Sequence, residues 1–143
     1  MSELRPRRGK VLVVDDDSVA LTLASERLEE AGYEVVTRMQ AIGTGSSMLR
    51  ERPDFVLLDV RMPGLTGDRL AAILAQNRYL ANVAIILHSG SDDTDLESLA
   101  RRCGAAGAIR KTMDDQRFIA EFERLADRWR TSVKPDGTGG RGP

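Results

Sequence analysis

Cysteine is almost absent from this sequence of 143 residues, in which Cys103 is the only one. A single cysteine excludes both an internal disulfide framework and a zinc site built from cysteines. A chain without disulfides is typical of the cytoplasm, which is the location that we expect. We predict that Cys103 packs into a helix face, because free cysteine usually behaves as a small buried hydrophobic residue.

Long apolar runs and a surplus of one charge are missing as well. The basic start RPRRGK is followed by VLVV, an apolar run that stops at Asp15 and is too short for a signal peptide. No segment is apolar over the roughly 20 residues that a membrane-spanning helix needs. The 21 basic and 22 acidic residues give a formal net charge of -1, which disfavours nucleic-acid binding through bulk charge. We therefore predict neither membrane insertion nor direct contact with nucleic acid.

Short apolar runs alternate with helical patterns along most of the chain. The strands are expected over residues 10–16, 33–39, 54–60, 83–89 and 107–111. The helices are expected from Ser18, as its cap, to Ala31, loosely before Pro53, from Asp68 to near Asn77, from a cap at Asp92 or Asp93 through Cys103, and from Asp114 onward. In the last helix we expect an inward apolar stripe of Phe118, Phe122, Leu125 and Trp129. Strands that are apolar on both faces and alternate with helices predict an α/β fold with a doubly wound, five-stranded parallel sheet.

One domain is expected to account for most of the chain. A length of 143 residues favours a single hydrophobic core, and we place the domain at residues 9–131. We expect residues 1–8 to form a flexible N-terminus. Residues 132–143, which include the polar run KPDGTGGRGP, are expected to form a disordered C-terminal tail.

Polar side chains stand at the ends of four predicted strands. These residues are Asp15 and Asp16, Asp59, Ser89 and Lys111, at the ends of the first, third, fourth and fifth strands. In a doubly wound sheet the ligands bind beyond these carboxyl ends, so we expect the side chains to meet there. Clustered carboxylates repel one another, and their oxygens suit Mg²⁺. Asp59 is then placed to attack phosphorus, while Lys111 and the Ser89 hydroxyl contact the phosphoryl oxygens.

These residues lie in motifs that resemble the receiver domain of bacterial two-component response regulators, including the free-standing chemotaxis type. The motifs are VLVVDDD, VLLDVRMPGLTG, IILHSG and GAAGAIRK, and the resemblance covers roughly residues 9–130. It implies a flavodoxin-like (β/α)5 fold with the strand order 2-1-3-4-5. It also implies that Asp59 accepts the phosphoryl group, that Ser89 is the switch hydroxyl and that Lys111 pairs with the phosphate.

The same resemblance implies a magnesium site and a set of partners. Asp16 corresponds to a direct magnesium ligand, Asp15 to a ligand largely through water, and the backbone carbonyl of Arg61 to a further ligand, beside Asp59. The family takes its phosphoryl group from a sensor histidine kinase or a phosphotransfer protein. It is not otherwise enzymatic, since it catalyses only its own phosphorylation and dephosphorylation.

The resemblance therefore predicts a stand-alone receiver that signals through protein contacts. No helix-turn-helix or catalytic domain is recognisable after residue 130, so we expect the output to pass to a protein target that the sequence does not identify. We expect the chain to act as a monomer or a weak homodimer.

Two positions depart from the family pattern. Ala108 stands where most relatives have an aromatic residue that reports phosphorylation, so the switch is expected to be atypical. Thr112 stands where relatives have proline after the lysine, commonly in a cis peptide. We expect a trans Lys111–Thr112 peptide or a strained cis one, with some displacement of Lys111. His88, the only histidine, is expected to be hydrogen-bonded beside the site rather than to carry a phosphoryl group.

Two other functions are compatible with parts of the sequence. The first is a receiver-like docking module that is never phosphorylated, which Ala108 and Thr112 favour and the complete acidic cluster opposes. The second is a phosphatase similar to the haloacid dehalogenases, because DDDSV fits their first motif with Asp15 as nucleophile and Asp17 as acid. The phosphatase interpretation leaves Asp59 without a function.

Overall fold

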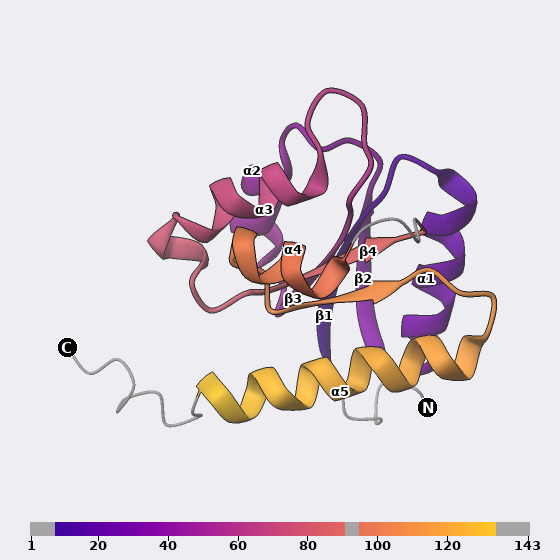
Figure 1. The fold of residues 1–143 in the computed structure, drawn as a ribbon. Coiled ribbons are helices and arrows are strands. Elements are labelled where there is room, and N and C mark those ends of the chain that lie inside the picture. Colours follow the sequence, from indigo (N-terminus) through magenta and orange to yellow (C-terminus); the bar gives the residue numbers. More distant parts are fainter. Residues whose placement is uncertain (1–7, 91–94, 134–143) are drawn as a thin grey trace.

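A five-stranded parallel sheet lies between two layers of helices (Figure 1). The computed structural model describes residues 8–90 and 95–133. Its main elements are β1 (Gly9–Val14), α1 (Ser18–Glu30), β2 (Tyr33–Arg38), α2 (Thr44–Glu51), β3 (Phe55–Asp59), α3 (Gly67–Ala75), β4 (Ala84–Ser89), α4 (Leu96–Cys103), β5 (Gly107–Arg110) and α5 (Asp115–Val133). Helices α1 and α5 cover one face of the sheet, and α2, α3 and α4 cover the other.

The strand order is β2-β1-β3-β4-β5, and every neighbouring pair is parallel. This confirms the doubly wound, flavodoxin-like fold. The order changes direction between β1 and β3, so the chain leaves these two neighbouring strands toward opposite faces of the sheet. A crevice is expected at this point, at the carboxyl ends of β1 and β3.

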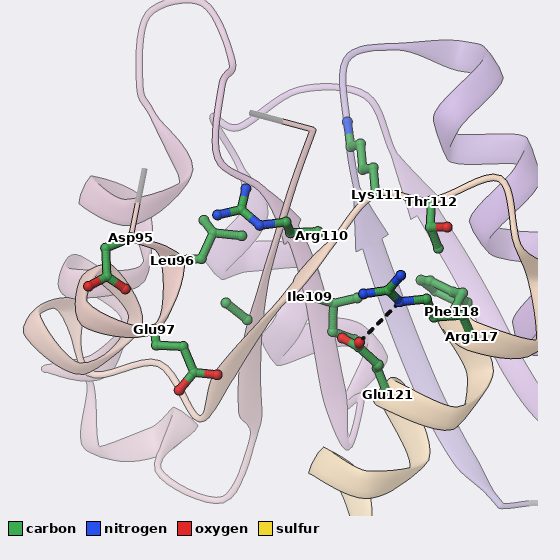
Figure 2. Close-up of a pocket in the computed structure, with 11 residues that line it drawn as sticks. Asp95, Leu96, Glu97, Ile109, Arg110, Lys111, Thr112, Arg117, Phe118 and Glu121 are labelled. Atoms are coloured by element: carbon green, nitrogen blue, oxygen red, sulfur yellow. Dashed lines mark ion pairs between the residues drawn. The ribbon is translucent and has the colours of Figure 1, made fainter. Parts of the chain in front are cut away.

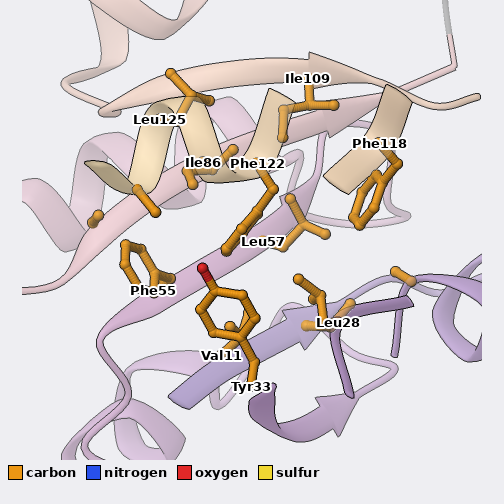
Figure 3. Packing of buried hydrophobic residues seen from close by; sticks show 14 of the residues in the cluster. Val11, Leu28, Tyr33, Phe55, Leu57, Ile86, Ile109, Phe118, Phe122 and Leu125 are labelled. Carbon is orange, nitrogen blue, oxygen red and sulfur yellow. The ribbon is translucent and has the colours of Figure 1, made fainter. Parts of the chain in front are cut away.

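The layer between the sheet and helices α1 and α5 holds most of the aromatic side chains (Figure 3). The ring of Phe122 lies 5.2 Å from that of Tyr33 and 5.4 Å from that of Phe55, both in edge-to-face geometry. Phe118 and Phe122 are fully buried, as the apolar stripe of the last helix predicted. Along β1 successive side chains alternate between the layers, so Val11 and Val13 face α1 and α5 while Leu12 and Val14 face α2 to α4.

The first strand ends and the first helix begins differently from the prediction. β1 stops at Val14 because the Asp15 carboxylate accepts a hydrogen bond from the Asp17 N–H at 2.9 Å, which turns the chain. The N-cap of α1 is Asp17, whose carboxylate accepts from the Val19 N–H at 3.0 Å, so the expectation that Ser18 caps this helix was wrong.

Later boundaries also differ in detail. The N-cap of α4 is Asp95, and the expected caps Asp92 and Asp93 lie outside the described residues. A short 3-10 helix at Arg78–Leu80 was not predicted. Helix α5 ends at Val133, so it includes two residues that were expected in the tail, and the disorder expected for the remaining residues, 134–143, stays a prediction.

Candidate functional site

Three carboxylates meet at the carboxyl ends of β1 and β3. Val14 pairs with Leu58 in the sheet, so Asp15 and Asp59, which follow them, end neighbouring strands. Carboxylate oxygens of Asp15, Asp16 and Asp59 lie within 4.8 Å of one another. Asp15 and Asp59 are buried, with exposed fractions of 2% and 4%, whereas Asp16 is exposed to solvent. The structure thus brings together the three acids that the sequence predicted.

Lys111 places its ammonium group between two of these acids. Its Nζ lies 2.9 Å from Asp15 Oδ2 and 3.2 Å from Asp59 Oδ1. The Lys111 N–H donates to the carbonyl of Ser89 at 2.8 Å, which fixes the end of β5 against β4. The expected displacement of Lys111 was therefore wrong.

The turn after Lys111 shows why no proline is needed there. The described residues contain no cis peptide bond, so the Lys111–Thr112 bond is trans, which is the first of the two forms that we expected. Thr112 Oγ1 accepts a hydrogen bond from the Asp114 N–H at 3.1 Å, and this local bond stabilises the turn into α5. A threonine hydroxyl thus supplies a turn that leaves the lysine in reach of the acids.

Burial dominates the electrostatics of this cluster. Burial raises the pKa of the Asp59 carboxyl from 3.8 to about 6. The positive charge of Lys111 opposes this rise, and the negative charge of Asp15 adds to it. Burial also lowers the pKa of Lys111, but the hydrogen bond to Asp15 and the charge of Asp59 outweigh it, so this pKa is raised. A buried acid with a raised pKa beside a fixed cation is typical of a functional site.

Gly67 allows the turn after β3 to pack onto Asp59. Its N–H donates to the carbonyl of Val60 at 2.8 Å. A Cβ at Gly67 would lie 2.1 Å from the backbone oxygen of Asp59, a distance that no side chain tolerates. This close approach between backbones is visible only in the structure.

Ser89 is the last residue of β4 and is buried beside the lysine. Gly90 follows it and is exposed, and a Cβ there would make only ordinary contact with the Lys111 side chain at 3.7 Å. The exposed, small Gly90 leaves this side of the crevice open. The predicted site therefore holds Asp15, Asp16, Asp59, Ser89 and Lys111 at one edge of the sheet, with Arg61 in the exposed turn beyond Asp59.

A hollow of about 470 Å³ lies over β5 between α4 and α5 (Figure 2). Ala108 lines it, together with Leu96 and Glu97 of α4. On the α5 side, Arg117 and Glu121 form an ion pair at 3.6 Å. An aromatic side chain at Ala108 would occupy part of this space, so the absence of the aromatic residue leaves a real hollow on this face.

His88 does not have the hydrogen-bonded environment that we expected. It lies on β4 with an exposed fraction of 4%, and its ring packs against Phe118 at 5.5 Å. Its Nε2 is buried without a hydrogen-bond partner, so the expectation was wrong for this atom. Burial lowers the pKa of His88 to about 3, with smaller contributions from Lys111 and Arg27. The imidazole is therefore neutral at physiological pH.

Comparison with known proteins identifies the family. The model of the response regulator receiver domain matches residues 11–123, which is most of the chain. The chain belongs to the response regulator receiver family.

Similar proteins include a relative of nearly the same length and much longer ones. Protein PilH of Pseudomonas aeruginosa is 27% identical over 112 residues, which are 78% of this chain and 92% of PilH. Response regulator PleD of Caulobacter vibrioides is 28% identical over 117 residues, which are 82% of this chain but only 26% of PleD. The solved structure of the chemotaxis response regulator CheY4 of Vibrio cholerae superposes with a TM-score of 0.73 at 24% identity, covering 81% of this chain and 97% of CheY4. The last comparison supports the fold.

The donor set of the crevice suits a hard divalent cation. Three carboxylates within 4.8 Å, of which one is exposed, supply oxygen ligands and leave room for water, the arrangement that Mg²⁺ prefers. Burial raises the pKa of Asp59 and so disfavours its ionised form, which a cation bound beside it would stabilise. Among the described helices, none is both long and apolar enough to cross a membrane.

Proposed function

We propose that this receiver domain accepts a phosphoryl group on Asp59 from a histidine kinase or a phosphotransfer protein, in a reaction that depends on Mg²⁺. The observation that carries the proposal is the contact of Lys111 Nζ with both Asp15 and Asp59, at 2.9 and 3.2 Å, inside the acidic crevice. Such a crevice concentrates negative charge and keeps one cation fixed beside the acceptor. A divalent cation bound by these acids would, together with the lysine, offset their charge and attract an anionic phosphoryl group.

The residues of the crevice have separate tasks in this transfer. A carboxylate oxygen of Asp59 attacks phosphorus, so that a P–O bond forms while the P–N bond of the phosphohistidine breaks. The electron pair of the P–N bond stays on the leaving imidazole, which takes its proton from solvent. Lys111 pairs with a phosphoryl oxygen, and the Ser89 hydroxyl donates a hydrogen bond to another.

The acids Asp15, Asp16 and Asp59 would hold the magnesium ion, together with the backbone carbonyl of Arg61. Bound Mg²⁺ supplies positive charge that offsets the carboxylates and the phosphoryl oxygens as charge builds up in the transition state. Asp16 is exposed, so the side of the metal site that it forms would face solvent. Asp15 and Lys111 remain paired at the buried side.

The signal leaves by a route that does not use an aromatic switch. Ala108 has no side-chain rotamer to change, and it borders the hollow between α4 and α5. Attraction of the Ser89 hydroxyl toward the phosphoryl group is therefore transmitted through the backbone of β4 and the start of α4. The output passes to a protein target.

Two observations bear on the alternatives. The Asp17 carboxylate caps α1 by accepting a hydrogen bond from the Val19 N–H. This contact disfavours the role of catalytic acid that a phosphatase of the haloacid dehalogenase type would need from it. The acids and the lysine form one intact cluster, which a module that is never phosphorylated would not require. The phosphoacceptor function accounts for both.

The test is incubation with Mg²⁺ and acetyl phosphate, followed by the mass of the intact protein. We expect a labile increase of one phosphoryl group that requires Mg²⁺ and that an Asp59→Asn variant lacks. An Asp16→Asn variant should fold but need a higher Mg²⁺ concentration for the same labelling, because it lacks one of the proposed magnesium ligands. Folded protein without any increase would refute the proposal, and steady hydrolysis of a phosphate monoester that Asp15→Asn abolishes and Asp59→Asn does not would favour the phosphatase.

A further inference from the structure

Lys111, which supplies the ammonium group of the crevice, lies just beyond the paired part of β5. β5 is an edge strand beside β4, and the pairing of the two strands ends at Ser89 and Arg110. One further backbone hydrogen bond, from the Lys111 N–H to the Ser89 carbonyl at 2.8 Å, extends it. Beyond this bond the chain leaves the sheet, so the direction of the lysine side chain depends on the turn that follows.

This turn, residues 112–114, stands between two hollows. The hollow of about 470 Å³ between α4 and α5 (Figure 2) and a second one of about 260 Å³ beside α1 are both lined by Lys111 and Thr112. Met113, in the middle of the turn, has an exposed fraction of 86%. Side-chain packing therefore restrains the turn weakly, and its local hydrogen bonds decide its conformation.

Two side chains of the turn accept hydrogen bonds from backbone N–H groups. Thr112 Oγ1 accepts from the Asp114 N–H at 3.1 Å, and Asp114 Oδ1 accepts from the Arg117 N–H at 3.1 Å. The first bond closes the kind of turn that a threonine forms with an N–H two residues further on, and the second caps the start of α5. The Thr112 hydroxyl thus links the end of β5 to the first turn of α5.

The far end of the turn is anchored to another helix. Asp115, the first residue of α5, accepts a hydrogen bond from Nε of Arg27 on α1 at 2.6 Å, and Arg27 has an exposed fraction of 6%. Lys111 and Asp115 are therefore both held, and the conformation can vary only in the residues between them. Loss of the Thr112 hydroxyl should leave the fold intact while it gives this turn more than one conformation.

A small change in the turn matters because the ammonium group has two partners at close range. Nζ of Lys111 lies 2.9 Å from Asp15 Oδ2 and 3.2 Å from Asp59 Oδ1. Such charge-assisted hydrogen bonds require short distances and good alignment. A lysine side chain is flexible and loses rotamer freedom when its end is fixed, so contact with both acids needs a well-defined backbone at its base.

We propose that Thr112 is a positioning residue for Lys111. By accepting the Asp114 N–H, its hydroxyl holds the turn in the conformation from which the ammonium group reaches Asp15 and Asp59 together. The same placement presents the ammonium group to a phosphoryl oxygen, and this second step rests on the proposed phosphoacceptor function. Thr112 thus acts on phosphoryl transfer through Lys111.

The ammonium group gives a readout that does not depend on phosphorylation. Untagged, ¹⁵N-labelled full-length protein without Mg²⁺ is studied by ¹H–¹⁵N correlation spectra of the lysine ammonium groups, and the Lys111 signal is assigned by its loss in Lys111→Ala. We expect a slowly exchanging Lys111 signal in the original chain and in Thr112→Ser, which keeps a hydroxyl. In Thr112→Val, which keeps the shape but has no acceptor, this signal should broaden or disappear.

The rate of labelling by acetyl phosphate at saturating Mg²⁺ measures the second step. Thr112→Val should be labelled roughly two- to tenfold more slowly, the loss expected from one neutral hydrogen bond, and Thr112→Ser should be labelled nearly as fast as the original chain. When Lys111→Ala is already present, the addition of Thr112→Val should cause no further loss, because a residue that acts through the lysine has nothing left to position.

Asn77→Ala is a matched control. It removes the acceptor of the Tyr79 N–H, a bond of 2.9 Å that also spans two residues but lies before the start of β4, away from the crevice. This variant should be labelled as fast as the original chain. An equal loss in Asn77→Ala would assign the effect of Thr112 to general stability and overturn the proposal.

Three other outcomes would overturn it as well. An unchanged ammonium signal in folded Thr112→Val would show that the hydroxyl does not place the lysine, and Thr112→Ala takes the place of this variant if it does not fold. Equal losses in Thr112→Ser and Thr112→Val would exclude the hydroxyl. A further loss in the double variant would show that Thr112 acts independently of Lys111. If the original chain is not labelled at all, the proposed function fails, and the ammonium signal alone decides the positioning.

Discussion

Replacing Asp59 by asparagine should make the protein more stable in the absence of magnesium. The carboxyl of Asp59 is buried with an exposed fraction of 4%, and its pKa is raised from 3.8 to about 6. A raised pKa means that the folded protein holds the ionised form less well than the unfolded chain does. Asparagine resembles the protonated acid in shape and carries no charge, so Asp59→Asn removes this penalty.

The size of the effect follows from the pKa values. A rise of about two pH units corresponds to about 3 kcal/mol, at about 1.4 kcal/mol for each unit. The penalty is absent below the unfolded pKa of 3.8, grows as the pH rises toward 6 and is complete above that value. The stability difference between the two proteins should therefore be near zero at about pH 4 and about 3 kcal/mol at about pH 8.

Urea unfolding measures this difference directly. Both proteins are unfolded at about pH 4 and about pH 8 in EDTA, and the free energies of unfolding are compared. Asp68→Asn, a change at a partly exposed acid in the first turn of α3, serves as a control that should not reproduce the pH dependence. A difference that does not change with pH, or an Asp59→Asn variant less stable at the higher pH, would refute the reasoning.

Three further substitutions test other parts of the account. Lys111→Ala should slow labelling by acetyl phosphate at least about tenfold, since it removes the fixed cation of the crevice; unchanged labelling kinetics would exclude the lysine from the mechanism. Gly67→Ala should lower the melting temperature strongly, because the new Cβ would lie 2.1 Å from the backbone oxygen of Asp59. The control Gly45→Ala, inside α2, places its Cβ 3.6 Å from Leu74 and should be neutral or stabilising by up to about 1 kcal/mol. Similar melting curves for the two variants would contradict this. Phe122→Ala should lower the free energy of unfolding in urea by about 3 to 5 kcal/mol, because the ring is fully buried. Tyr79, whose exposed fraction is 81%, should lose less than about 0.5 kcal/mol when it is replaced by alanine, and equal losses would show that the core is misassigned.

The position of Asp59 could be predicted because it depends on few contacts. An apolar run that ends on an acid predicts a buried strand with a carboxylate at its end, and parallel pairing carries Asp15 to the neighbouring strand end. The topology alone brings Ser89 and Lys111 to the same edge. Strand periodicity and the alternation of elements were therefore enough to predict the fold and the members of the site.

Features that depend on which of several neighbouring side chains bonds to a backbone N–H could not be predicted. Whether Asp17 or Ser18 caps α1 depends on which side chain reaches an N–H of the first turn. The turn after Lys111 depends on a hydrogen bond from the Asp114 N–H to Thr112, which replaces what proline provides in relatives. The sequence pattern contains no signal for either choice.

The most direct test of the central claim is the location of the phosphoryl group. The protein is labelled with acetyl phosphate and Mg²⁺ and then treated with borohydride, which reduces an acyl phosphate to an alcohol, and its peptides are mapped by mass spectrometry. The account predicts reduction at Asp59 alone, in a peptide that is unmodified when Mg²⁺ is withheld. Modification at Asp15 instead of Asp59, or folded protein that is labelled at neither, would contradict it.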